Sequence, residues 1–507
     1  MPLRYSFIAL LLLAFAGCAT VDFDYPREAS VAIDANEDTT LKRRVDEWLA
    51  EHPGPSGFYP LVNGTDALGA RLRLIEQAEK TIDAQYFLMK ADSAGFVFGA
   101  ALLEAADRGV RVRFLLDDIF TTVGERELAI IDGHPNVELR LFNPISRKGI
   151  DVFNYLGTFE SANRRMHNKS FIVDNQIAIV GGRNIADEYF ELNTGGEFRD
   201  FDMIAVGPAA AAVSEEFDAF WNHSRAVPAE AVVGKFSEEQ IAQFLAKIDR
   251  QYLEEGRNIY REAVNSDLMR SFQARGRPLF SADATVLTDD PDKLVREISQ
   301  ENMILIQEMA EIVRSAKSEV VVATPYFVPG NEGVEFWRSI VDKGVRVVIV
   351  TNSLAANNHT AVHSAYARYR KDIILAGVEL YEARANAVSE TREGAPQPKA
   401  MTMHTKAMIF DRERLFVGSL NLDPRSIEIN SEMGMIVDSA EMTGELADKL
   451  FENLGKWTYR VKLNDDGQLR WHATIDGVEV VETSEPLASW WQKFSAWFLK
   501  IAPERQL

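Results

Sequence analysis

Cysteine is almost absent from the sequence. The 507 residues contain one, Cys18, so no disulfide framework can form, and a chain of this length does not need one to build a core. Long apolar runs are also absent from the interior of the chain, so we expect no membrane-spanning helix there. The length predicts two or three globular units rather than one.

Basic residues are fewer than acidic ones. The chain has 55 lysine and arginine residues against 76 aspartate and glutamate residues, which gives a formal net charge of -21 at pH 7. Such a field repels a phosphate backbone, so we expect no nucleic-acid partner. A local basic pocket remains compatible with this charge balance.

The first 18 residues have the pattern of a lipoprotein-type signal segment. Arg4 supplies the positive start, an apolar stretch follows over 7–15, and two small residues lead to Cys18. The tetrapeptide Phe-Ala-Gly-Cys resembles the bacterial lipobox, with Phe15 in the place of the usual leucine. We therefore interpret Cys18 as a lipidation site. A general signal peptide and an uncleaved anchor are the alternatives.

The residue after this cysteine bears on location. It is Ala19 rather than aspartate, which by resemblance to bacterial lipoprotein sorting favours the outer membrane over the inner one. We therefore expect a lipid-anchored protein of the bacterial cell envelope, facing the periplasm and working at a membrane surface.

Helix and strand patterns alternate along the chain and do so twice. In the first half, helical periodicity over 67–81 and 96–109 alternates with apolar strands over 82–89 and 110–118. The same order recurs over 303–353, and the paired segments nearly superimpose. This alternation predicts an α/β protein with a mostly parallel sheet covered by helices, built from one duplicated unit.

The expected organisation has six parts. The two copies should pack about a pseudo-twofold axis as α/β/α domains, with a helical connector between them and a C-terminal extension of β-hairpins and one amphipathic helix. The boundaries are a signal segment over 1–18, a linker over 19–57, a first domain over 58–226, the connector over 227–277, a second domain over 278–460, and the extension over 461–507.

The C-terminal helix carries an unusual concentration of aromatic side chains. Its apolar stripe consists of Trp490, Trp491, Phe494, Trp497, Phe498 and Ile501. One interpretation is a helix that lies in a membrane interface. The other is a terminal helix docked on the protein core, and the sequence does not choose between them.

The chemistry is concentrated in one motif that occurs twice. A histidine is followed two residues later by a lysine and five residues after that by an aspartate, then by an apolar strand and a Gly-[Gly/Ser]-x-Asn sequence. A single copy is a weak signal, but two copies inside a duplicated unit form a strong one. The paired members are His167 and His404, Lys169 and Lys406, Asp174 and Asp411, Gly182 and Ser419, and Asn184 and Asn421.

The spacing has a physical meaning. Side chains two residues apart on a strand share a face, so each histidine and lysine can address one ligand. If the two copies pack together, one cleft holds two imidazoles, two ammonium groups and two amides. We expect the substrate-binding residues there to be Asn184, Asn421, Gly182 and Ser419. Lysines and amides suit the oxygens of a phosphate diester, one histidine can attack phosphorus, and the other can protonate the leaving alkoxide. We expect no metal and no cofactor, because a carboxylate cluster is lacking.

The acids near the motif divide into two kinds. Asp174 and Asp411 belong to the motif but lie where a turn is expected, so we interpret them as structural members that bond the turn or a neighbouring strand. Asp200 and Glu432 each open the next apolar strand, and we expect them to orient the histidines through the second ring nitrogen. The alternative for these two is an exposed acid at a strand edge.

These residues carry a family resemblance. The paired motifs resemble those of the phospholipase D superfamily, and the segments 59–92, 163–190, 351–370 and 421–426 are similar to its bacterial cardiolipin synthase C branch. The resemblance spans about 59–438. It implies a two-step, metal-independent phosphatidyl transfer in which His167 becomes phosphorylated and His404 acts as acid and then base. The near symmetry of the copies leaves that order open.

The resemblance implies phospholipid substrates. The expected reaction moves a phosphatidyl group to phosphatidylglycerol, giving cardiolipin, with phosphatidylglycerol or phosphatidylethanolamine as donor. Two alternatives stay open: a phospholipase D or other phosphodiesterase that uses water, and a lipoprotein of the envelope that binds lipid without catalysis. No motif identifies an accessory protein.

Other polar and aromatic residues rank lower. Tyr86 and Tyr326 end strands that look equivalent and fit core positions better than the cleft. His359 and His363 are four apart but lack a third zinc ligand, so a structural or pocket-lining role is expected. Asp117, with Asp118, suggests a solvated loop.

Overall fold

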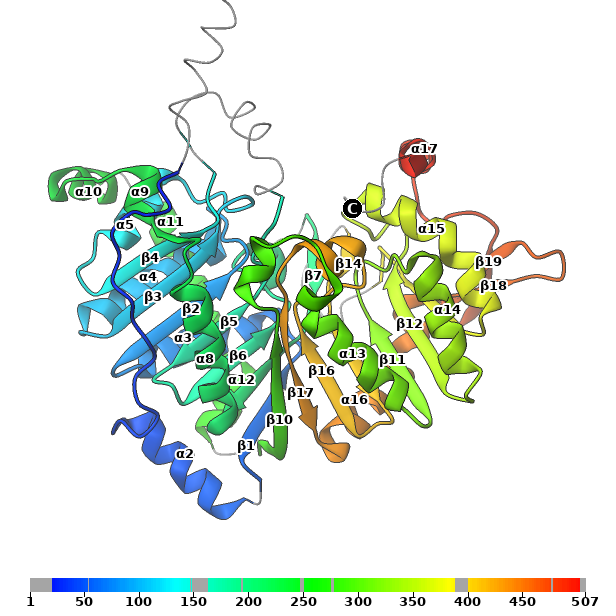
Figure 1. Cartoon of the computed structure of the whole chain (residues 1–507), viewed down its shortest axis with the longest axis horizontal. Coiled ribbons are helices and arrows are strands. Elements are labelled where there is room, and N and C mark those ends of the chain that lie inside the picture. Colours follow the sequence, from blue (N-terminus) through cyan, green and yellow to red (C-terminus); the bar gives the residue numbers. More distant parts are fainter. Residues whose placement is uncertain are drawn as a thin grey trace, which may run out of the picture.

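The computed structural model describes residues 21–501 except 53, 146, 148–162, 193–194, 247–249, 275–277, 388–399 and 476. Cys18 and the signal segment lie outside the described residues. The core of the fold is one long sheet in which two similar halves lie side by side, with helices packed against it (Figure 1).

The strands of the first half follow an order that the second half mirrors. From the outer edge inward the first half reads β9 (Ala226–Pro228), β4 (Val137–Phe142), β3 (Arg111–Asp117), β2 (Thr81–Tyr86), β5 (Ser170–Val173), β6 (Ile177–Gly181), β8 (Asp202–Val206) and β1 (Ser56–Leu61). The second half continues through β10 (Phe280–Thr288), β17 (Met433–Asp438), β16 (Arg414–Gly418), β15 (Ala407–Phe410), β11 (Glu319–Ala323), β12 (Arg346–Asn352), β13 (Glu379–Ala383) and β18 (Thr458–Leu463). The order reverses about the β1–β10 pair, as expected for two repeats related by a pseudo-twofold axis.

The expectation of a mostly parallel sheet is wrong. In this long sheet only β2–β3–β4 and β11–β12–β13 pair in parallel, and the other described pairings are antiparallel. Helical crossovers join the parallel strands. The alternating helix and strand patterns in the sequence belong to these strands and helices. The motif strand β5 instead turns directly into β6, and a tight turn can join only antiparallel neighbours.

Helices cover both faces of each half. On one face lie α3 (Gly64–Gln77), α4 (Ser93–Asp107), α13 (Ile304–Ser315), α14 (Gly330–Val341) and α15 (Thr360–Leu375), with a short α5 (Glu125–Asp132) near β4. α8 (Pro208–Trp221) and α16 (Ala440–Trp457) bury side chains in another cluster, which contains residues of both halves. The two repeats therefore share part of their hydrophobic core.

The segments outside the repeats also form helices. Residues 40–51, inside the expected linker, form α2 (Thr40–Glu51). Its Leu41 and Val45 lie one turn apart and are buried in the hydrophobic core of the first half. The connector contains α9 (Ala229–Val233), α10 (Glu238–Leu245), α11 (Arg250–Val264) and α12 (Asp267–Gln273), and α11 packs on α3 and α4.

The C-terminal extension continues the sheet. β18, β19 (Leu469–Ile475) and β20 (Val478–Glu482) form antiparallel hairpins, as expected for this extension. Helix α17 (Trp490–Phe498) follows and packs on α15. Within the described residues, no helix combines the length and apolar character needed to span a bilayer.

Candidate active site

Each motif is joined to the other half of the molecule by backbone hydrogen bonds. The His167 N–H donates to the Ser431 carbonyl at 3.0 Å, and the His404 N–H donates to the Arg199 carbonyl at 2.6 Å. The second contact extends a short parallel pair of strands, β7 (Glu197–Arg199) and β14 (Met401–Met403). The two copies of the motif therefore meet, and each meets the segment that carries the other half's orienting acid.

The histidines and the acids pair across the halves. His167 Nδ1 lies 2.8 Å from Glu432 Oε2, and His404 Nδ1 lies 2.6 Å from Asp200 Oδ2. All four side chains are buried, so Asp200 and Glu432 are not exposed strand-edge acids. An ionised carboxylate can only accept, so when the acid is ionised Nδ1 carries the proton and Nε2 of the ring keeps its lone pair.

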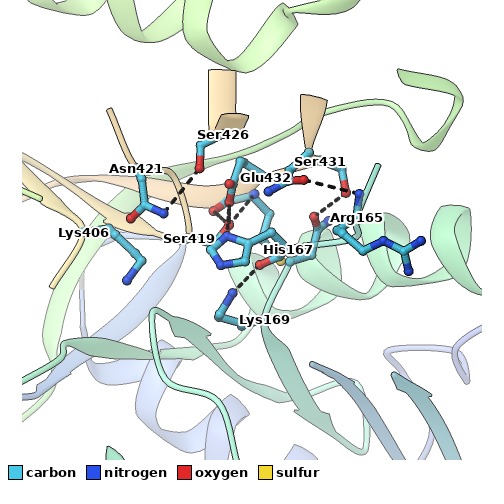
Figure 2. A network of polar contacts seen from close by, with 12 residues as sticks. Arg165, His167, Lys169, Lys406, Ser419, Asn421, Ser426, Ser431 and Glu432 are labelled. Carbon is cyan, nitrogen blue, oxygen red and sulfur yellow. Dashed lines mark hydrogen bonds and ion pairs between the residues drawn. The ribbon is translucent and has the colours of Figure 1, made fainter. Parts of the chain in front are cut away.

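The two lysines lie beside the histidines. Lys169 Nζ donates to the carbonyl of His167 (Figure 2). Lys406 Nζ donates to the carbonyl of His404. Lys406 Nζ is also 2.7 Å from His404 Nδ1, a nitrogen that cannot both accept this bond and donate to Asp200. We favour the bond to Asp200, because it is shorter and the other half has the same arrangement.

Burial and mutual repulsion set the charges of the cationic groups. Burial, with the charges of both lysines, lowers the pKa of His404 to about 3 and that of His167 well below its ordinary value. Burial lowers the pKa of Lys169 to about 7 and that of Lys406 to about 8. Both imidazoles are therefore neutral at pH 7, whereas the pKa of each lysine lies close to that pH.

The two orienting acids differ. Burial raises the pKa of Glu432 to about 7. Burial acts on Asp200 in the same direction, but the charge of Lys406 and the interactions with His404, including its hydrogen bond, outweigh it and hold the Asp200 pKa below its ordinary value. Asp200 is therefore ionised at neutral pH, whereas Glu432 is near its midpoint.

Gly182 and Ser419 support the acids instead of facing a ligand. A Cβ at position 182 would lie 2.2 Å from Asp200 Oδ1, so glycine leaves the space that this carboxylate occupies. The Ser419 hydroxyl donates to Glu432 Oε2 (Figure 2). It also accepts a hydrogen bond from the Met433 N–H. The expectation that these two bind substrate does not fit these contacts, because one position makes room for an acid and the other bonds to one.

The two asparagines are also held by the protein. Asn184 accepts from the Leu88 N–H at 3.3 Å and donates to the Tyr189 hydroxyl at 3.0 Å. Asn421 donates to the Ser426 hydroxyl at 3.3 Å, and its buried Oδ1 has no partner among the described residues. Direct contact of either amide with a phosphate stays a prediction.

Asp174 and Asp411 lie at the far ends of β5 and β15 from the histidines. The Asp174 carboxylate accepts from three backbone N–H groups, those of 79–81, at 2.8 to 3.1 Å. Asp411 does the same for 317–319. Both residues have positive φ, 50° and 53°, which aspartate tolerates in a tight turn. These contacts match the structural interpretation of both acids.

Asp117 was misinterpreted from the sequence. It is fully buried, accepts from the Met166 N–H at 2.9 Å, and forms an ion pair with Arg165 at 3.2 Å. It thereby fixes the backbone just before His167. The sequence did offer one indication of a role near the site, namely the position of Asp117 at the carboxyl end of a parallel strand. Functional loops commonly lie at that edge of a sheet.

Aromatic rings enclose the imidazoles, and the sequence indicated few of them. Phe198 stacks on His404 with a centroid distance of 5.1 Å, and Tyr189 and Tyr326 approach it edge-on at 5.3 and 6.4 Å. Phe87 approaches His167 edge-on at 4.8 Å. Apolar walls of this kind exclude water and lower the local dielectric.

The two tyrosines singled out from the sequence are not equivalent. β2 and β5 pair Gln85 with Ser170, whereas β11 and β15 pair Ala323 with Ala407. Tyr86 therefore corresponds to Thr324, and Tyr326 lies two residues further on, beside His404. Tyr86 is a core residue, as expected, whose hydroxyl accepts from Arg71 at 2.9 Å. Tyr326 also packs against a hydrophobic core, but unlike Tyr86 its ring approaches His404.

The remaining histidine pair does not form a metal site. His359 approaches Tyr326 edge-on at 5.3 Å, and His363 is buried beside Arg370. Among the described residues, no three histidine, cysteine or acidic side chains cluster in a way that could hold a metal ion.

A cavity of about 830 Å3 lies behind this site. The cavity and the site share Phe198, which stacks on His404, and Asp200, which pairs with His404. The imidazoles and lysines of the motif do not line the cavity.

Comparison with known proteins agrees with this arrangement. The family described as cardiolipin synthase, PLD-like domain, matches residues 72–221 and 309–454, once in each repeat. Cardiolipin synthase C of Escherichia coli is 35% identical over 90% of this chain and 96% of its own length. The chain belongs to the cardiolipin synthase family of phospholipase D-like proteins. It is a phosphatidyltransferase of the phospholipase D superfamily.

Two further likenesses extend over nearly the whole chain. An uncharacterized protein of Helicobacter pylori is 30% identical over 100% of both chains. The crystal structure of a phosphatidylserine synthase of Haemophilus influenzae superposes with a TM-score of 0.56 at 13% identity, covering 92% of this chain and 99% of that one. The second likeness concerns the fold, and it agrees with two phospholipase D-like repeats.

Proposed function

We propose that this family member makes cardiolipin by moving a phosphatidyl group from a donor phospholipid to phosphatidylglycerol through a phosphohistidine. The observation that carries the proposal is the crossed pairing of His167 with Glu432 and His404 with Asp200. It leaves two reactive Nε2 atoms beside two lysines. One Nε2 can then act as the nucleophile and the other as the general acid on the same phosphate diester.

In the first step, His167 Nε2 attacks the phosphorus of the donor. The phosphorus–oxygen bond to the head group breaks, and His404 gives its proton to the departing alkoxide. Lys169 and Lys406 stabilise the charge on the non-bridging oxygens. The bound phosphate raises the low pKa of His404, because an anion beside an imidazole favours its protonated form.

In the second step, the acceptor replaces the head group. His404, now neutral, takes the proton from a hydroxyl of phosphatidylglycerol, and that oxygen attacks the phosphohistidine. The phosphorus–nitrogen bond breaks, His167 is regenerated, and His404 is again protonated. The product is cardiolipin when the transferred group is phosphatidyl.

The unequal acids support this division of roles. Asp200, whose carboxyl has a lowered pKa, stabilises an imidazolium on His404, which suits the acid. Glu432, whose pKa is raised, stabilises a positive ring less, which suits a His167 that starts neutral and attacks.

Hydrolysis at the same site is the second candidate, since the geometry serves a water molecule as well as an alcohol. The test is a thin-layer assay of the purified protein with labelled phosphatidylglycerol, with and without phosphatidylethanolamine. Labelled cardiolipin supports transfer, and phosphatidic acid alone assigns the protein to hydrolysis. The absence of any product contradicts both and leaves a lipid-binding role.

The proposal includes attachment to the envelope through a lipid on Cys18, with the site facing the periplasm at the outer membrane. The lipobox-like sequence before Cys18 supports this. Cys18→Ser should abolish incorporation of labelled fatty acid in cells. Continued labelling of that variant contradicts the lipidation site.

A further inference from the structure

We propose that helix α17 inserts its aromatic face into the interface of a lipid bilayer and holds the His404 side of the site beside that surface. The inference rests on the proposed function for one point, namely that the substrate is a membrane lipid. It concerns a different part of the chain from the reacting groups.

The aromatic face of α17 is open to solvent. The exposed fractions are 73% for Trp490, 64% for Trp491, 40% for Phe494, 66% for Trp497 and 56% for Phe498. Monomeric soluble proteins rarely present so many large apolar side chains together, and such a patch indicates an interaction surface. Tryptophan in particular favours the boundary between water and acyl chains.

The helix is fixed to the protein by its other side. Ala496 is its buried residue, and the Ala496 carbonyl accepts a hydrogen bond from the Ser364 hydroxyl of α15 at 2.5 Å. A capping box formed by Ser489 and Gln492 begins the helix. α17 therefore docks on the core, as one interpretation of the sequence had it, but through a small residue that leaves the aromatic stripe free for a further partner.

Charge favours a lipid surface as that partner. Residues 486–501 contain Lys493 and Lys500 and no acidic residue, in a chain whose formal net charge is -21. A segment with aromatic residues and lysines but no acids is complementary to an anionic bilayer, whereas a second copy of the same segment would bring like charges together.

The position of α17 connects it to the site. α15 begins after His359, whose ring approaches Tyr326, and Tyr326 approaches His404. Ser364, which contacts α17, lies five residues further along the chain, a rise of about 7.5 Å at about 1.5 Å per residue. Figure 1 shows α17 above α15, at the edge of the second half. A bilayer on the aromatic face of α17 would therefore lie close to the His404 side of the site.

Tryptophan fluorescence provides a direct test. Full-length protein is mixed with vesicles of phosphatidylglycerol and phosphatidylethanolamine whose acyl chains carry bromine, which quenches only nearby indoles. We expect quenching for the wild type and for Trp48→Phe, a matched control in α2. The triple variant Trp490→Ser, Trp491→Ser, Trp497→Ser should lose it. Equal quenching in the triple variant overturns the proposal.

Two further readouts separate this proposal from the others. On a water-soluble short-chain diester the triple variant should keep wild-type activity, while activity on vesicles falls by roughly tenfold or more. A protein inactive on both substrates but quenched by the vesicles contradicts the proposed function and supports the docking. A wild type that dimerises without lipid and is not quenched assigns the aromatic face to a second copy and overturns the docking.

Discussion

His404 and Asp200 are 204 residues apart in the chain, and their side chains meet at 2.6 Å. The counterpart pair, His167 and Glu432, is separated by 265 residues and meets at 2.8 Å. Each repeat thus supplies an imidazole to the site and orients the imidazole of the other repeat. The experiments that follow test whether this crossed pairing does the chemistry.

Replacing Asp200 by asparagine should slow the reaction without unfolding the protein. Asparagine keeps the size of the side chain but removes the charge that stabilises an imidazolium on His404. We expect kcat to fall by roughly 10²–10⁴-fold, the range of one general acid. The measurement is turnover of labelled phosphatidylglycerol, with the thermal midpoint as control. A variant that retains wild-type kcat contradicts the role of Asp200.

A donor with a good leaving group should distinguish the two histidines. A nitrophenolate departs without a proton, so a phosphatidyl nitrophenyl ester does not need the acid in the first step. His404→Ala should therefore release nitrophenol in a burst of one equivalent and leave a phosphatidyl group on the enzyme. His167→Ala should release none.

The site of the adduct completes this comparison. Digestion of the trapped His404→Ala protein should place the phosphatidyl group on His167. A burst from His167→Ala instead, with the adduct on His404, would reverse the order of attack that we propose.

The pH profile of kcat/KM should be bell-shaped and centred near pH 7. A lysine is cationic below its pKa, so Lys169, with a pKa of about 7, and Lys406, with a pKa of about 8, lose charge as the pH rises from 7 to 9. Binding of the anionic diester then weakens. Below pH 7 the Glu432 carboxylate, with a pKa of about 7, takes up a proton and loses its hold on His167.

A substitution tests the alkaline side of this profile. The guanidinium of Lys169→Arg stays charged throughout this pH range, so its alkaline limb should move upward and follow Lys406 alone. An alkaline limb that stays in place means that Lys169 does not titrate there.

Asp174→Asn should affect stability and spare catalysis. The carboxylate accepts three backbone hydrogen bonds in a buried turn, and losing its charge should reduce the free energy of unfolding by about 2 kcal/mol. Asp411→Asn is the matched control, in a turn whose Ser318 is exposed, and should have a smaller effect. Denaturant unfolding and the kcat of the folded enzyme are the measurements. A lower kcat in an Asp174→Asn variant that is fully folded would show that Asp174 takes part in catalysis.

The sequence predicted what is local or repeated and missed what depends on packing between the halves. The spacing placed His167 and Lys169 beside each other, as the structure has them, although both lie just before β5 and not on it. The duplication predicted that a second pair would join them. The acids were identified by position, but nothing in the sequence says that Glu432 serves His167 and Asp200 serves His404, because that pairing exists only after the halves meet.

Other differences have the same origin. Gly182 and Ser419 occupy corresponding positions, but their roles depend on an acid that lies beside them only in the folded protein. Tyr326 reached the site because β11 and β15 pair in a register that shifts it two residues from Tyr86. Local patterns carry no information about such registers, whereas the turn at Asp174 was accessible because its cause lies within the motif.

The backbone bonds from His167 to Ser431 and from His404 to Arg199 also limit how this protein can be divided. A fragment that ends in the connector would keep a complete motif and lose the acid that orients it. Either half alone is therefore an incomplete catalyst, and cutting the connector should preserve activity only as long as the two pieces remain associated. Each half therefore needs the acid of the other half, although the two acids, Asp200 and Glu432, are not identical.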